Sequence, residues 1–177
     1  FYGGIYRDVE LLVVSAEHFD LDYYGGPGIK YVTEVNGTSA TVKVDAYTNV
    51  KDLAEAGLSV EITLKDADGV VVATAVAAKT ADGVHAELPI EKVHLWDGVA
   101  DPYLYPLTAQ LKRGETVVDE IGCNVGVRTF YVDPEKGFFL NGKLTTFKGV
   151  CNHHDLGPLG AAVNDAAIRR QIRIMKD

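Results

Sequence analysis

Residues 125–155 read VGVRTFYVDPEKGFFLNGKLTTFKGVCNHHD, and the interpretation of the whole chain depends on them. Their last part is a strand-like run at 145–150 that leads directly into a polar cluster, Cys151-Asn152-His153-His154-Asp155. Polar residues at the carboxyl end of a parallel strand, just before a helix, lie at the active-site rim of a (β/α)8 barrel. We therefore expect a β-rich region to give way here to the first strand of such a barrel.

The segment after this cluster has the sequence features of a helix. Asn164 is a good N-cap, and Asp165 lies where the positive end of the helix dipole favours an acid. Apolar residues recur at helical spacing and form one face that needs a cover: Ile168, Ile172 and Met175. A complete barrel needs on the order of 250 residues. We therefore expect residues 134–177 to be the truncated start of a (β/α)8 catalytic barrel, and the chain to be a piece of a larger protein.

Most of the chain before this stretch shows the alternation of half-buried strands. Apolar and polar residues alternate over residues 40–47, 58–64 and 84–90, so one face of each strand packs on a core. About seven short strands over roughly 100 residues, separated by tight turns, match an immunoglobulin-like sandwich. The predicted fold class is mainly β: an immunoglobulin-like antiparallel β-sandwich, then a β-hairpin at Asn141-Gly142 and the first βα unit of a truncated TIM barrel.

Turn-forming and charged residues divide the chain into three predicted regions. The segment Asp133-Pro134-Glu135-Lys136-Gly137 combines Pro and Gly with charged residues, and it marks the boundary after the sandwich, which occupies residues 15–133. Residues 1–14 precede the sandwich, and their apolar run ELLVV at 10–14 has the length of a strand. We interpret residues 1–14 as the end of a preceding domain or as a tether.

One stretch inside the sandwich region is irregular and aromatic. Residues 95–105, LWDGVADPYLY, contain the only Trp of the chain, Trp96, together with Tyr103 and Tyr105. These rings either form a platform on which a sugar ring stacks, or they anchor a crossover loop by burying a large apolar area. The structural interpretation is favoured, and the sugar platform is the alternative.

The composition narrows the classes of partner. The formal net charge is -8 and no basic patch is evident, so nucleic acid is not expected as a partner, and a neutral ligand fits the charge better. No run reaches the ~18 consecutive apolar residues of a membrane helix, so we expect no membrane partner. The first four residues, FYGG, lack the features of a signal peptide. The compartment, periplasmic or cytoplasmic, is left open.

The residues that could bind a metal are poorly arranged for it. Cys123 and Cys151 lie on different predicted strands and outside C-x-x-C spacing, which favours buried free thiols, with a disulfide as the alternative. His153, His154 and Asp155 are adjacent, and neighbours in an extended strand point to opposite faces, so they cannot all reach one ion. We expect neither a metal site nor a cofactor.

Four segments of the chain stand out as possible family motifs. In chain order they are residues 3–9 (GGIYRDV), residues 95–105 (LWDGVADPYLY), the pair 126–130 (GVRTF) and 139–143 (FLNGK), and residues 148–155 (KGVCNHHD). In this order and spacing they resemble glycoside hydrolase family 2, the family of β-galactosidases and β-glucuronidases. The first resembles the end of that family's sugar-binding-like domain, the second its L-W-x-P-x-x-P-Y-L-Y motif, and the third its exit from the immunoglobulin-like domain. The fourth resembles the K-G-V-N-x-H-E-x segment that ends its first barrel strand.

The resemblance implies an activity for a longer parent enzyme. Members of the family are retaining glycosidases, in which one carboxyl protonates the leaving oxygen and a second, ~5 Å away, attacks the anomeric carbon. Both carboxyls are glutamates on later barrel strands and are not in this chain. We therefore expect no catalytic residue here, and we expect the chain by itself to be an inactive scaffold.

The resemblance also implies contacts with a carbohydrate substrate. The family's glycone-pocket histidine corresponds to His153, whose neutral imidazole can donate to one hydroxyl and accept from another. His154 stands where the family more often has Glu, and Asp155 where galactosidases often have His, so the contacts of these two candidates depart from the family pattern.

The run HHDLG at 153–157 favours a β-galactosidase as the parent enzyme. The alternatives are a β-glucuronidase, or a standalone β-sandwich module that binds carbohydrate or another partner. We also expect the exposed barrel start to offer a surface for homo-oligomerisation.

Overall fold

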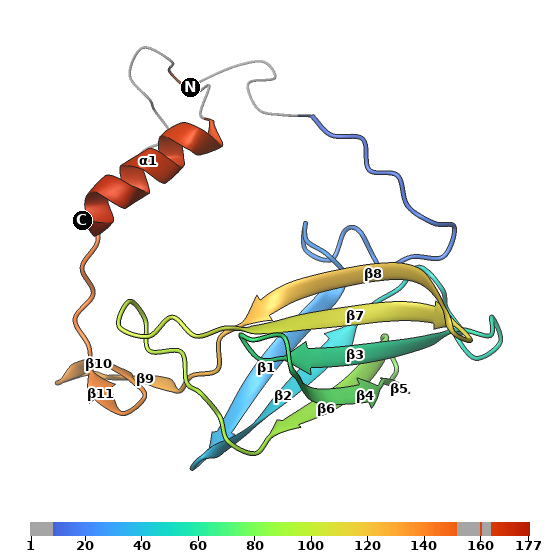
Figure 1. Cartoon of the computed structure of the whole chain (residues 1–177), viewed down its shortest axis with the longest axis horizontal. Coiled ribbons are helices and arrows are strands. Elements are labelled where there is room, and N and C mark those ends of the chain that lie inside the picture. Colours follow the sequence, from blue (N-terminus) through green and yellow to red (C-terminus); the bar gives the residue numbers. More distant parts are fainter. Residues whose placement is uncertain (1–8, 152–159, 161–163) are drawn as a thin grey trace. The chain divides into compact units, whose positions relative to one another are not determined.

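The structure, a computed structural model, describes residues 9–151, 160 and 164–177. These residues fall into two compact units. One unit covers Val14–Thr146 and contains all the strands (Figure 1). The other described residues, nearer the two ends of the chain, belong to the second unit, which includes the helix.

Two four-stranded antiparallel sheets form a sandwich in the larger unit (Figure 1). The first has the order β1-β2-β6-β5 and comprises β1 (Ile29–Asn36), β2 (Ser39–Ala46), β5 (Ala78–Lys79) and β6 (Val84–Ile90). The second has the order β4-β3-β7-β8 and comprises β3 (Ser59–Lys65), β4 (Val71–Val76), β7 (Tyr105–Arg113) and β8 (Thr116–Val125). This order is that of immunoglobulin-like sandwiches, so the predicted fold class is confirmed for this part of the chain.

The core lies between the two sheets and is built from the predicted alternation. On β2, β3 and β6 every second side chain is buried, because successive side chains of a strand point to opposite faces. Val42, Ile62 and Leu88 are fully inaccessible to solvent. Asn36 and Ser39 face each other across the predicted hairpin, where Gly37 has a φ of +62°.

The chain passes from one sheet to the other between β4 and β5. Only Ala77 separates the two strands, and its amide donates to the Val60 carbonyl at 2.8 Å. The short strand β5 then joins the first sheet by pairing with β6. This crossing gives eight sandwich strands among the described residues, where the sequence predicted about seven.

A third, small sheet follows the sandwich and has the order β11-β10-β9. It consists of β9 (Phe130–Asp133), β10 (Gly137–Leu140) and β11 (Lys143–Leu144). The predicted hairpin at Asn141-Gly142 is confirmed, and both turn residues have the positive φ, +48° and +77°, that such two-residue turns need. The predicted domain boundary at 133/134 falls in the turn between β9 and β10, and it stays a prediction.

Two predicted strands are wrong for the described residues. Residues 10–14 and 145–150 have no strand assignment, and Leu11, Val13, Phe147 and Val150 are more than 70% exposed. A strand is stabilised by a ladder of hydrogen bonds to a neighbour. In the described part of the chain neither segment belongs to a sheet, although the Thr145 amide donates to the Phe138 carbonyl of β10 at 2.8 Å. Apolar composition alone therefore did not produce strands here.

The strand predicted to run on through Val125 to Val132 is interrupted. β8 ends at Val125, and β9 begins only at Phe130. Between them the Gly126 backbone packs so closely on Trp96 and Leu104 that a Cβ would lie 3.3 Å from each side chain. The Val127 carbonyl accepts a hydrogen bond from the Trp96 amide at 2.8 Å. A contact with a distant loop, invisible in the local pattern, therefore ends the strand.

The predicted helix is confirmed as α1 (Asp165–Lys176). The Asn164 side chain caps it by accepting from the Ala167 amide at 2.9 Å. No residue of α1 is buried, and Ile172 and Met175 are 53% and 51% exposed, so much of the apolar face is left uncovered by the described residues. No helix in the described residues is long and apolar enough to cross a membrane.

The cysteines differ from the prediction of two buried thiols. Both are free, but Cys151 is exposed and Cys123 is only partly buried. Cys151 lies in the segment that forms no strand, which explains its exposure. Burial raises the pKa of the Cys123 thiol above its ordinary value.

Candidate functional site

The three residues predicted to contact substrate, His153, His154 and Asp155, lie outside the described residues. Their predicted role therefore stays a prediction. What the structure does describe is how the motifs at 95–105, 126–130 and 139–143 come together at one end of the sandwich. We call this set of contacts the junction network; it comprises His94, Trp96, Asp97, Asp101, Tyr103, Tyr105, Arg128, Thr129, Asn141 and Lys143.

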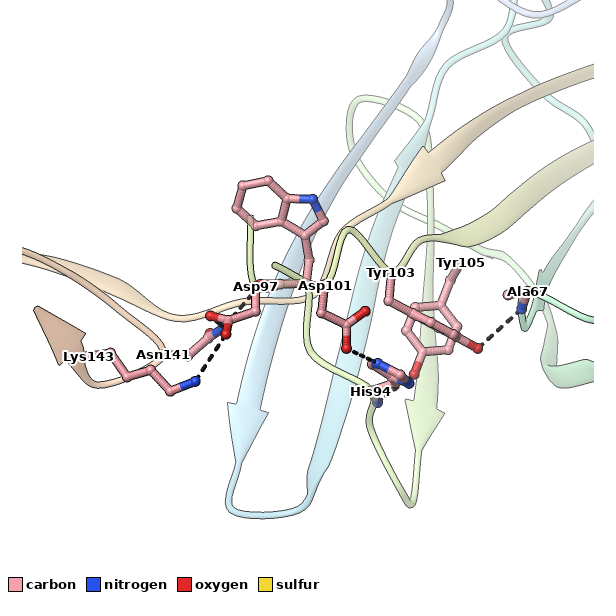
Figure 2. A network of polar contacts seen from close by, with 9 residues as sticks. Ala67, His94, Asp97, Asp101, Tyr103, Tyr105, Asn141 and Lys143 are labelled. Atoms are coloured by element: carbon pink, nitrogen blue, oxygen red, sulfur yellow. Dashed lines mark hydrogen bonds and ion pairs between the residues drawn. The ribbon is translucent and has the colours of Figure 1, made fainter. Parts of the chain in front are cut away.

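Asn141 is the centre of the junction network. Its amide donates to the Thr129 carbonyl at 2.9 Å, and its side-chain oxygen accepts from the Thr129 amide at 3.0 Å. Its side-chain Nδ2 donates to the Trp96 carbonyl at 3.0 Å and to Asp97 Oδ1 at 3.3 Å. One side chain at the β10–β11 turn thus ties the small sheet to the loop between β6 and β7 (Figure 2).

Trp96 occupies the middle of the network and is partly buried. The Arg128 guanidinium lies over its ring, 5.1 Å from the ring centroid, which is a cation–π distance. Gly126 packs against the same side chain. The Trp96 ring is therefore held between the residues of the Gly126-Val127-Arg128 motif.

The two tyrosines of the aromatic stretch are equally engaged. Tyr105 is 2% exposed, and its hydroxyl accepts from the His94 amide at 2.8 Å. Tyr103 stacks on the His94 ring with centroids 3.9 Å apart, and its hydroxyl accepts from the Ala67 amide at 3.1 Å. Asp101 in turn binds His94 Nε2 at 2.6 Å, as Figure 2 shows. These contacts support the anchoring role, because little ring surface is left for a sugar.

An ion pair closes the network on the side of the hairpin. Lys143 Nζ lies 3.0 Å from Asp97 Oδ2, and the Asp97 amide donates to the Asp101 carbonyl at 2.7 Å (Figure 2). The Lys143 ammonium, and after it the Asn141 amide, hold the pKa of Asp97 below its ordinary value of 3.8. The Lys143 side chain is exposed and Asp97 is partly buried, so solvent screens the pair and it orients the hairpin more than it stabilises the fold.

We expect acid to weaken this contact in a defined direction. Because the pKa of folded Asp97 is lowered, its contribution to stability is present above 3.8 and is lost as the pH falls through the folded pKa. A carboxyl NMR titration from about pH 6 to about pH 2 should place the Asp97 midpoint below 3.8 in the native chain. In Lys143→Met the midpoint should move up toward 3.8, and an unchanged midpoint would contradict the assignment.

The junction network is suited to holding elements in place rather than to reacting. Its side chains are paired with one another, and no buried side-chain nitrogen or oxygen in the described part of the chain lacks a partner. The described part of the chain also contains no group of three His, Cys, Asp or Glu side chains that could bind a metal ion. The arrangement therefore ties the small sheet to the loop between β6 and β7 of the sandwich.

The fold and the network together define a class: an immunoglobulin-like sandwich with a connecting sheet clamped to one end. The family model described as Glycosyl hydrolases family 2 matches residues 28–128. The chain belongs to this family, as its four motifs predicted.

The chain is similar to several characterised proteins over nearly its whole length. It is 32% identical to a β-glucuronidase of Bacteroides fragilis, covering 100% of this chain and 26% of that protein. It is 36% identical to a β-galactosidase of Bacteroides ovatus, covering 98% of this chain and 20% of that protein. The crystal structure of an FMN-binding β-glucuronidase from Facaelibacterium prausnitzii L2-6 superposes with a TM-score of 0.88 at 35% identity, covering 99% of this chain and 26% of that one.

Sequence reasoning missed how the motifs are connected. It singled out Trp96 and the Asn141-Gly142 turn, but it gave no role to His94, Asp101 or the Lys143–Asp97 pair. Their partners lie 7 and 46 positions away along the chain. The order of the motifs was visible in the sequence, whereas their convergence on Asn141 required the fold.

Proposed function

We propose that this chain is a non-catalytic scaffold within a retaining β-glycosidase, in which it connects the sandwich to the start of the catalytic barrel. The observation that carries the proposal is the junction network, because three family motifs meet there around Asn141. In the proposed enzyme, this connection holds the small sheet on the sandwich at the point where the chain continues to the barrel. Precise placement of substrate contacts by rigid elements is what a glycosidase site needs.

The small sheet supports a place within a larger enzyme. Its aromatic side chains stack in pairs, Tyr131 on Phe139 at 4.6 Å and Phe130 on Phe138 at 6.1 Å. On one face of this sheet Phe130 and Val132 nevertheless remain more than 60% exposed, and on the opposite face so does Leu144. Exposed apolar groups gathered on a three-stranded sheet mark a contact surface. We propose that the rest of the enzyme covers this surface.

The substrate that we propose is a terminal β-linked galactoside. The HHDLG run at 153–157 and the 36% identity to the Bacteroides ovatus β-galactosidase support it. A β-glucuronide is the second candidate, supported by the B. fragilis and F. prausnitzii relatives. A glucuronidase would need a cationic group for the substrate carboxylate, and we expect that group in a part of the enzyme outside this chain.

We also propose that His153 contacts sugar hydroxyls, with His154 and Asp155 as neighbours in the glycone pocket. The support is the match of residues 148–155 to the family segment that ends the first barrel strand. The boundaries 1–14, 15–133 and 134–177 are part of the same proposal. In it, the first region ends a sugar-binding-like domain and the last begins the barrel.

Hydrolysis assays test the proposal. The 177-residue chain alone should release no aryl alcohol from aryl β-galactoside or aryl β-glucuronide, because the two glutamates of the mechanism are supplied by later barrel strands. The longer protein that contains it should hydrolyse the galactoside with the higher kcat/KM. His153→Ala in that protein should lower kcat/KM by roughly 10- to 100-fold, the worth of one or two hydrogen bonds in a closed site.

Each result has a contrary outcome. Hydrolysis by the purified chain alone would overturn the scaffold role. A higher kcat/KM on the glucuronide would replace the galactoside by the second candidate. Inactivity of the longer protein on both aryl glycosides would reject the glycosidase proposal itself.

A further inference from the structure

A tyrosine turn lies away from the junction network, in the loop that precedes β1. Tyr24 is 95% exposed and has a φ of +51°, a left-handed conformation that bulky residues rarely adopt. The next residue, Gly25, has a φ of +75°, and the Gly26 amide donates to the Tyr23 carbonyl at 3.0 Å. The turn therefore holds a large ring out in solvent at a conformational cost. Strained residues of this kind persist where the surrounding structure enforces them, often at binding sites.

The ring of Tyr24 has an aromatic support. Tyr23 stacks on Tyr47 with centroids 4.4 Å apart and an interplanar angle of 15°, and Tyr24 meets Tyr23 edge to face at 5.0 Å. The hydrogen bond between the Tyr47 and Tyr23 hydroxyls, and after it burial, raises the pKa of Tyr47 to about 12. We call Tyr23, Tyr24 and Tyr47 the tyrosine platform.

The platform is fixed to the sandwich by backbone contacts. The Asp20 amide donates to the Tyr47 carbonyl, and the Tyr47 amide donates to the Gly28 carbonyl, each at 2.9 Å. Gly83 packs so close to Tyr47 that a Cβ there would lie 3.1 Å from the ring. The loop on both sides of the exposed ring is thus held before any ligand arrives, which reduces the entropy lost on binding.

Acidic side chains near the platform favour a neutral ligand that carries hydroxyl groups over an anionic ligand. Asp45 and Asp82 lie close enough to act on the Tyr47 hydroxyl, and Asp22 and Asp82 are exposed. Asp45 is already paired with His85 Nδ1 at 2.8 Å and lies 3.9 Å from Lys30 Nζ. Carboxylates accept hydrogen bonds from hydroxyl groups and repel anions. Asp82 also lines a cavity of about 490 Å³ at this end of the sandwich, together with Thr48, Lys51, Lys79 and Thr80.

We infer that the tyrosine platform is a second, non-catalytic carbohydrate site, which takes a pyranose ring of a neutral oligosaccharide on the exposed face of Tyr24. The apolar C–H face of the sugar stacks on the ring, and carboxylates near the platform accept hydrogen bonds from its hydroxyl groups. The choice of a sugar rests on the proposed function, whereas the existence of the platform does not. Such a site would hold the enzyme on an oligosaccharide away from the bond that is cleaved.

The test is an NMR titration of the 177-residue chain with three sugars: lactose, cellotetraose and methyl β-D-glucuronide. Binding is detected as shifts of the backbone amide resonances. The two neutral sugars should shift the resonances of residues 22–28 and 47 with a dissociation constant on the order of 1 mM. The glucuronide, an anion, should bind at least about tenfold more weakly. No shift at these residues with either neutral sugar would overturn the inference, and so would preferential binding of the glucuronide.

Variants separate ring stacking from loop structure. Tyr24→Phe should retain binding, because it keeps the ring, while Tyr24→Asn should weaken binding at least about tenfold. Asn suits the left-handed region, so the thermal midpoint of Tyr24→Asn should not fall. Tyr131→Ala removes an exposed tyrosine of the small sheet and should leave binding unchanged. Equal affinity in native chain and Tyr24→Asn would place the sugar elsewhere and overturn the inference.

The outcomes remain distinct from those of the hydrolysis assay. Binding is measured on a chain that carries no catalytic glutamate, and hydrolysis is measured on the longer protein. A chain that binds without the parent being a glycosidase would reject only the proposed function. A parent that hydrolyses glycosides while the chain binds no sugar would reject only the platform.

Discussion

Gly28→Ala is expected to lower the free energy of unfolding by about 3 kcal/mol, in the range that backbone strain and broken hydrogen bonds reach. A Cβ at this buried position would lie 2.6 Å from the Tyr47 carbonyl oxygen and 2.7 Å from the Asp20 amide nitrogen. Both are backbone atoms and are joined by a 2.9 Å hydrogen bond, so neither can move alone. Relief of the clash would pull the loop from β2 beside Phe19, which is fully buried in the core.

Gly26→Ala is the matched control for this variant. It lies two positions away in the same loop, and the nearest atom to its Cβ would be the Tyr23 carbonyl oxygen at 3.6 Å, an ordinary contact. Its effect should stay within about 0.5 kcal/mol. Urea denaturation followed by Trp96 fluorescence and far-UV circular dichroism measures both. Equal urea midpoints for Gly28→Ala and Gly26→Ala would show that the loop adjusts to a Cβ at position 28. Glycine would then not be required there for stability.

Asn141→Ala is expected to reduce the free energy of opening of the small sheet by about 2–3 kcal/mol. The change removes the acceptor for the Thr129 amide and the donor to the Trp96 carbonyl, both at 3.0 Å. It also places alanine at a φ of +48°, where a Cβ is unfavourable without the local hydrogen bonds that asparagine makes. Amide exchange of β9 and β10 measures the opening directly.

Two further variants divide this effect into its parts. Asn141→Gly removes the same hydrogen bonds but tolerates the positive φ, so it should cost about 1 kcal/mol less than Asn141→Ala. Lys143→Ala removes only the ion pair between the exposed Lys143 and Asp97, and it should cost less than about 1 kcal/mol. Exchange in β10 that is equally slow in native chain and Asn141→Ala would contradict the central role of Asn141 in the junction network.

The proposed function depends on this junction more than on any reactive group in the chain. The sandwich contributes a platform of fixed geometry, and the small sheet carries the chain from it toward the residues proposed to contact substrate. If Asn141→Ala loosens this connection, we expect the longer enzyme to lose activity without losing any group that touches the sugar.

Local sequence patterns determined the parts of this protein that depend on neighbours in the chain. Period-two alternation placed Val42, Ile62 and Leu88 in the core, because side-chain direction in a strand is set by the backbone itself. The Asn141-Gly142 pair fixed a hairpin turn, and Asn164 fixed the start of α1, since both act within a few residues.

Tertiary structure alone decided what those elements do together. Residues 145–150 have the composition of a strand but form none, because ladder partners come from other segments. From the sequence, Tyr103 and Tyr105 could either bind a sugar or anchor the loop between β6 and β7. In the structure both contact His94 and anchor that loop. Conversely, Tyr24, which has no role in the sequence motifs, is the most exposed ring of the described aromatic stacks. The pairing of segments that are distant in sequence is a property of the packed chain, and no local pattern encodes it.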